Sequence, residues 1–129
     1  MSMYEVIGTT KTTPLLAEPG GEELIAIPLA TGNGVIARGT VMFRGSDKLY
    51  SPAAASDAVD TNYLVVLDED ANTSGEAVVT ARAYRSGRLV DGAVVLKAGA
   101  AVTDAIQLAL RKQGIVLKPM VAEAAETNT

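Results

Sequence analysis

The sequence predicts a small β-rich α+β domain with one helix in its C-terminal half. Three observations support this fold class. A chain of 129 residues holds one core that buries about two thirds of the surface of the unfolded chain. Short runs rich in β-branched residues recur between clusters of Gly, Asp, Asn and Ser. Only residues 103–113 place apolar side chains at a clear helical spacing, and alternating βα units are absent.

Residues 1–22 are expected to form an extended N-terminal arm, because Thr, Pro and Gly alternate there with only brief apolar runs. An extended segment of this kind can add as a strand to the sheet edge of a partner. Main-chain hydrogen bonds then supply affinity, and alternate side chains supply specificity. The expected contact residues of the arm are Tyr4, Val6, Ile7, Thr9, Thr10, Thr12, Leu15 and Leu16.

The β domain itself is expected to span residues 23–117, followed by a polar tail over residues 118–129. In the stretch 78–85, larger side chains alternate with Ala, which is typical of a strand with two unlike faces. A turn is expected at residues 85–88, where Gly87 can adopt positive φ and close a hairpin. The strand-like runs of the domain are 23–29, 35–43, 63–67, 77–84, 89–96 and 115–117.

The helix expected at residues 103–113 has recognisable ends. Thr103 is a suitable N-cap, and Asp104 places an acid in the first turn. Gly114 can take the left-handed conformation that ends a helix, which would bring the next residue against the apolar face. That face consists of Ile106, Ala109 and Leu110.

Composition excludes several classes of function. The chain has a net charge of -4, only 11 Lys and Arg, and no Trp, which disfavours nucleic acid as a partner. It has no Cys and no His, so thiolate chemistry and the commonest general base and metal ligand are absent. No apolar stretch is long enough for a membrane span and no signal peptide is visible, so synthesis in the cytoplasm is expected. We therefore expect a protein that is not an enzyme and holds no cofactor or metal.

One acidic loop, residues 68–76, is the strongest chemical candidate. Its first oxygen-bearing positions fit a calcium-binding loop, but Thr73 and Val79 replace the required Gly and Glu. A solvated turn is therefore the favoured interpretation. A hydrolase that uses Asp68 and Asp70 as paired carboxylates is the least favoured alternative, since sequence alone does not place them across a cleft.

Tyrosines are the main aromatic residues of the chain. Tyr63 and Tyr84 are expected in the core or at its rim, because both lie in strand-like runs. Tyr4 and Tyr50 are left as candidate contact residues.

The order and spacing of four segments resemble the lambda-type head decoration proteins of tailed bacteriophages. These segments are VIARGTVM at 35–42, YLVVLDED at 63–70, ARAYRSGR at 81–88 and AIQLALRKQGIVL at 105–117. The resemblance covers residues 23–117 and implies a compact, β-clip-like domain without enzymatic activity. It also implies a homotrimer at three-fold positions on the outer surface of an expanded phage head, which it cements against internal DNA pressure. The partner of the N-terminal arm would then be the major capsid protein.

The alternative is a β-rich module of a phage tail or baseplate that binds a glycan or another protein. Glycan sites usually use aromatic platforms, and this chain has one Phe and four Tyr. The composition therefore counts against a glycan.

Overall fold

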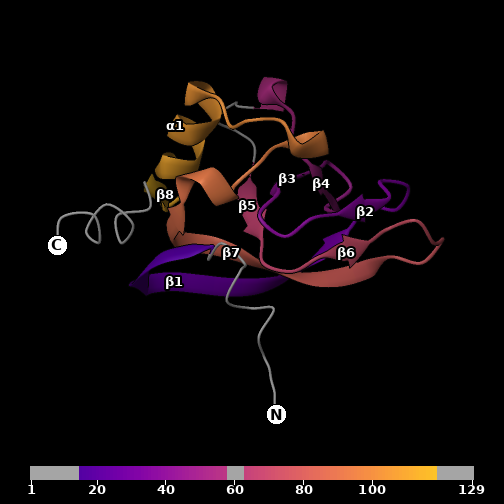
Figure 1. Cartoon of the computed structure of the whole chain (residues 1–129). Coiled ribbons are helices and arrows are strands. Elements are labelled where there is room, and N and C mark those ends of the chain that lie inside the picture. Colours follow the sequence, from indigo (N-terminus) through magenta and orange to yellow (C-terminus); the bar gives the residue numbers. More distant parts are fainter. Residues whose placement is uncertain (1–14, 58–62, 119–129) are drawn as a thin grey trace, which may run out of the picture.

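The computed structural model describes residues 15–57 and 63–118 of the chain. These residues form a β-rich α+β fold with one α-helix, α1 (Asp104–Lys112), so the predicted fold class is confirmed (Figure 1). The strands are β1 (Leu16–Leu29), β2 (Val35–Ile36), β3 (Val41–Arg44), β4 (Tyr50–Pro52), β5 (Leu64–Leu67), β6 (Ala71–Asn72), β7 (Val79–Val90) and β8 (Ile115–Lys118). Short 3₁₀ helices lie at Ala55–Asp57, Asp91–Ala93 and Lys97–Gly99.

The main sheet has the strand order β1-β4-β3-β5-β7-β8, and β1 also pairs directly with β7. This extra pairing closes the first five of these strands into a small barrel, and β8 pairs with the second half of β7 on the edge opposite β1. In Figure 1, β1 and β7 run side by side along the lower border. The short β2–β6 pair lies on the far side from α1 (Figure 1).

Two aliphatic clusters form the core. The first lies under α1 and joins Leu89 of β7 to Ile106 and Leu110 of the helix. The second fills the barrel and includes Ile27 and Leu67. Both clusters consist mainly of closely packed aliphatic side chains, because the chain has one Phe, four Tyr and no Trp.

Helix α1 begins and ends as predicted. The Thr103 hydroxyl accepts a hydrogen bond from the Ile106 amide at 3.3 Å, which caps the first turn. Gly114 has φ +100°, and its amide donates to Arg111 O at 3.1 Å. This bond belongs to the Schellman pattern, which turns the chain directly into β8. The predicted apolar face is buried against the first core cluster.

The hairpin predicted at residues 85–88 is wrong, because β7 continues without a turn from Val79 to Val90. Parallel β8 pairs with its second half, where Gly87 lies opposite Ile115. The irregularity lies in β1 instead: residues 19–22 form a large bulge opposite Gly87 of β7, because Glu18 pairs with Arg88 and Glu23 pairs with Ser86. Gly20 and Gly21 have φ of +102° and +81°, so the bulge uses the freedom that only glycine has.

The single strand predicted at 35–43 is divided into β2 and β3. Gly39, with φ +95°, interrupts it and turns the chain between the two sheets. The strand predicted at 23–29 exists but begins earlier, at Leu16. The folded domain therefore includes residues 15–22, which were expected in the arm.

Candidate functional site

The expected contact residues of the N-terminal arm fall into two groups. Leu15 and Leu16 belong to the domain: Leu15 is only 2% exposed within the first core cluster, and Leu16 packs against that cluster. The Leu15 side chain is therefore occupied by the core, whereas Leu16 is only half-buried beside it. The others, which lie outside the described residues, are Tyr4, Val6, Ile7, Thr9, Thr10 and Thr12.

Leu15 fixes the point where the N-terminal segment joins the domain. Its carbonyl accepts a hydrogen bond from the Val90 amide at 2.8 Å, and the next residue pairs with Leu89 of β7. On the other side of β7, Val90 pairs with Lys118 at the end of β8. Residues 1–14 and 119–129 are therefore attached at the same end of the sheet.

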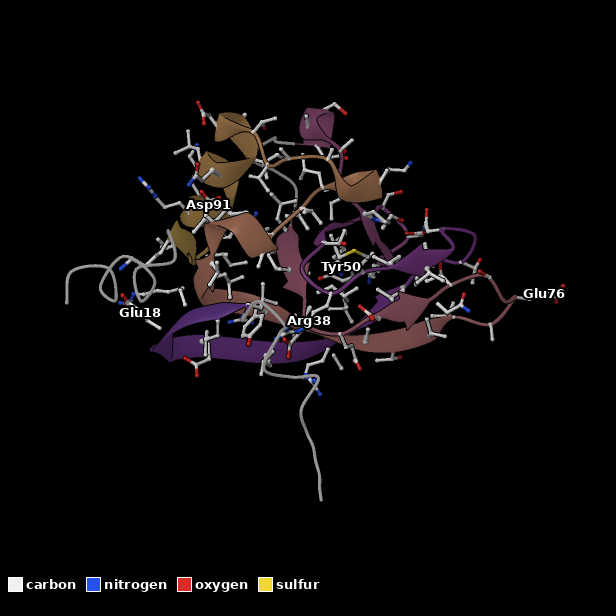
Figure 2. The ribbon with its side chains drawn as sticks, in the orientation of Figure 1. Glu18, Arg38, Tyr50, Glu76 and Asp91 are labelled. Carbon is white, nitrogen blue, oxygen red and sulfur yellow. The ribbon has the colours of Figure 1, made fainter. Side chains whose placement is uncertain are left out.

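Glu18 connects the three strands that meet at this end. Its carboxylate lies 3.6 Å from Arg88 Nε on β7 and 3.1 Å from Lys118 Nζ on β8. Figure 2 shows Glu18 beside the ends of β1 and β8. All three side chains are between one third and one half exposed, so each ion pair contributes little to stability.

The acidic loop after β5, for which the sequence favours a solvated turn, binds three of its carboxylates to other parts of the domain. The Asp68 carboxylate is 3.3 Å from Arg38 Nε and 3.0 Å from Arg82 Nε. Its two neighbours accept main-chain hydrogen bonds: Asp70 from the Arg38 amide at 2.8 Å, and Glu69 from the Arg82 amide at 2.7 Å. Each of these three carboxylates therefore has a partner, and the loop joins β5, β7 and the turn before β3.

The charges of this network act on neighbouring groups. The hydrogen bond from Arg82 to Asp68, followed by the charges of Asp68 and Glu69, raises the pKa of the arginine. Burial, and secondly the Asp68 charge, raises the pKa of the Tyr84 hydroxyl. Across residues 15–57 and 63–118, no set of three acidic side chains converges in a way that could hold a metal ion. We call the ion pairs of Asp68 with Arg38 and Arg82 the clamp, because they hold the loop to its neighbours.

Thr73, where the calcium-loop pattern requires Gly, is fully buried and holds the middle of the loop. Its hydroxyl donates to Gly34 O at 2.8 Å and accepts from the Asn33 amide at 3.0 Å. The hydroxyl at this position therefore ties the loop to the turn at residues 33–34.

Substitution of Asp68 tests the clamp. Asp68→Asn is expected to lower the free energy of unfolding by about 1–3 kcal/mol, because the buried Asp68 side chain loses its charge-assisted hydrogen bonds. Glu76→Gln in the same loop is the matched control: it removes the same charge from an exposed side chain at the loop tip (Figure 2). Chemical denaturation of both variants measures the difference. Equal stability of the two would show that the clamp contributes nothing.

Two of the tyrosine predictions are wrong. Tyr50, expected as a contact residue, is 9% exposed and lies inside the molecule (Figure 2). Tyr63, expected in the core or at its rim, is 61% exposed, with the Arg44 guanidinium 5.5 Å from its ring centroid. Tyr84 is buried, as predicted. Tyr4 lies outside the described residues.

Sequence reasoning missed the two arginines of the clamp. The alternation in β7 signals that Arg82 points outward, but nothing local links Arg38 to an aspartate 30 positions away.

Among helices of the described ranges, none has the length and hydropathy needed to span a bilayer.

Comparison of the chain with protein-family models, with curated proteins and with solved structures finds no match in any of the three.

Proposed function

We propose that this chain is a capsid decoration protein. In this proposal it binds as a homotrimer at three-fold positions on the outer surface of an expanded phage head and reinforces the shell against internal DNA pressure. The major capsid protein is its partner, and residues 1–14 make the contact. No catalytic step, cofactor or nucleic acid takes part.

The observation that carries the proposal is how the N-terminal segment is anchored. A segment that holds a shell must pass its load to a rigid body without pulling out of the fold. Leu15, directly after the segment, is buried in the core, and β1 then pairs antiparallel with β7 along most of its length. A pull on residues 1–14 is thus met by a buried side chain and by a ladder of hydrogen bonds, which is suited to an adhesive role.

The attachment of both chain ends at one end of the sheet also supports the proposal. Both terminal segments start beside the Glu18 ion pairs, so they can meet the same surface of a partner. A trimer would multiply such contacts. Once one copy docks, the others bind at an effective concentration of about millimolar, so a modest affinity per segment gives durable attachment.

Electron microscopy of phage heads tests the proposed function. Expanded heads that lack this protein are incubated with the full chain and imaged beside untreated heads. We expect added density at the three-fold positions of the outer surface. Heads without added density would contradict the proposal, and density on the tails or baseplates of complete virions treated in the same way would favour the alternative, a tail or baseplate binding module.

A further inference from the structure

The outer edge of β1 is open between Glu23 and Pro28. On one side this stretch pairs with β7. On the other side β1 meets β4 only through Leu29 and Tyr50. No other strand of the described residues lies along it, and Figure 1 shows β1 at the border of the molecule.

Hydrogen bonds on β7 show which groups of β1 face this opening. The Arg82 carbonyl accepts from the Asp68 amide at 2.8 Å, and the Arg82 amide donates to Glu69, so both main-chain groups of Arg82 point away from β1. Successive residues of a strand direct these groups to opposite sides. Ala81 and Ala83 therefore bond toward β1.

Ile27 and Ile25 of β1 lie opposite Ala81 and Ala83. Their main-chain groups therefore form hydrogen bonds with β7. The residues between and beside them, Leu24, Ala26 and Pro28, direct theirs to the open side.

Two further observations agree with this assignment. The Ala30 amide, two residues beyond Pro28 and so on the same side, donates to Tyr50 O of β4 at 2.9 Å. Pro28 itself has no N–H, and proline is tolerated in a strand only where that group faces an edge. The open edge thus offers the amide and the carbonyl of Leu24 and of Ala26.

A pocket of about 310 Å³ lies where β1 diverges from β4. Ile25 lines its β1 side, and Arg44 and Arg85 supply two guanidinium groups. No carboxylate of the described residues pairs with Arg44, whereas Arg85 Nε lies 3.2 Å from Glu23. The pocket is therefore locally cationic in a chain whose net charge is -4. Its aromatic and apolar surface comes from Tyr50, Tyr63 and Val65.

We propose that the open edge of β1 and this pocket together form a docking site for an extended acidic segment of another protein. Its main chain pairs with Leu24 and Ala26, and a Glu or Asp side chain lies between Arg44 and Arg85. The main-chain bonds give affinity without regard to sequence, and the arginines select a carboxylate. This site is independent of the proposed capsid contact, since here the chain accepts a strand rather than contributing one.

The exposure of β1 supports an occupant for this site. Folded proteins usually shield an edge with charged residues, a bulge or a covering loop. Here Leu24 is 43% exposed and Ala26 is exposed as well, so apolar side chains border the open main-chain groups. Protective features lie only at the ends of this opening: Pro28 at one end, and Glu23 and the 19–22 bulge at the other.

Binding of a designed peptide to the full chain tests the site. The probe is a short capped peptide of alternating valine and threonine with one central glutamate, and its control carries lysine instead. By fluorescence anisotropy we expect the glutamate peptide to bind at least about tenfold more tightly than the lysine peptide. Ala26→Pro is expected to weaken binding of the glutamate peptide by about tenfold or more, because it removes an open amide that β7 does not use.

Charge reversal at the pocket provides a second test. Arg44→Glu is expected to abolish the preference for glutamate, whereas Lys97→Glu, outside this pocket, makes the same change in net charge and should preserve it. Thermal denaturation confirms that each variant is folded. Equal affinity for the two peptides, or full binding by Ala26→Pro, would overturn the proposal. So would protection of the Leu24 and Ala26 amides from hydrogen exchange in the free chain, which would mean that the chain or a second copy already covers the edge.

Discussion

Replacing Gly39 with alanine is expected to lower the free energy of unfolding by about 3–5 kcal/mol. A Cβ atom at this position would lie 2.2 Å from the carbonyl oxygen of Ala93, far inside van der Waals contact. The backbone conformation adds to the cost, because φ is +95° and residues with a side chain rarely adopt it. The two penalties act on the same residue.

Main-chain hydrogen bonds prevent the backbone at Gly39 from moving away. Its amide donates to Leu67 O of β5 at 2.7 Å, and its carbonyl accepts from the Val95 amide at 2.9 Å. Relief of the clash therefore requires loss of at least one bond between the 37–40 turn and its neighbours. The opposing atom belongs to the backbone, so it has no rotamer that would make room.

Gly92→Ala is the matched control for Gly39→Ala. Gly92 is exposed, a Cβ atom added to it would have no other atom within 4 Å, and its φ is not in the left-handed range. We expect a change within about 0.5 kcal/mol of the parent chain. Urea denaturation of both variants, with the slope m checked for constancy, gives the comparison. A Gly39→Ala variant as stable as Gly92→Ala would show that the 37–40 turn is looser than its hydrogen bonds indicate.

The elements predicted correctly are those whose signals are local. Thr103, Asp104 and Gly114 specify the ends of α1 within one short stretch, and the apolar spacing between them specifies its buried face. The turn predicted at 85–88 is wrong, although Gly87 is a typical signal for a hairpin. Gly87 instead permits close approach: its Cβ would lie 3.0 Å from that of Glu22 in the bulge of β1. A contact between residues so far apart in sequence leaves no local pattern.

The candidate site was harder to predict for the same reason. The partners of Asp68 are 30 and 14 positions away. The local sequence therefore shows the negative charge of the loop but not the arginines that pair with it. Leu15 was placed in the arm because Thr and Pro precede it and the Gly-rich bulge follows it. Its burial depends on the end of β7 and on α1, which only the folded chain brings to it.

Two N-terminal cuts made a few residues apart are expected to give opposite results. A chain that begins at Pro14 keeps Leu15 and the whole of β1, so its stability should stay within about 0.5 kcal/mol of the parent. A chain that begins at Ala17 loses Leu15 from the core and Leu16 from its margin. Loss of a fully buried leucine costs about 2–5 kcal/mol, and the second leucine adds to this, so the shorter chain should unfold at much lower urea concentration.

The longer of these two chains separates adhesion from folding. If residues 1–13 hold the capsid, the chain that begins at Pro14 should remain folded and lose nearly all occupancy on expanded heads. The variant Leu15→Ala keeps those residues but loosens their anchor, so at low temperature it should still occupy the heads while its free energy of unfolding falls by about 2–5 kcal/mol. Occupancy of the Pro14 chain equal to that of the full chain would show that the segment is not the adhesive element. Loss of occupancy by the Ala17 chain alone would carry no such meaning, because that cut removes part of the domain itself.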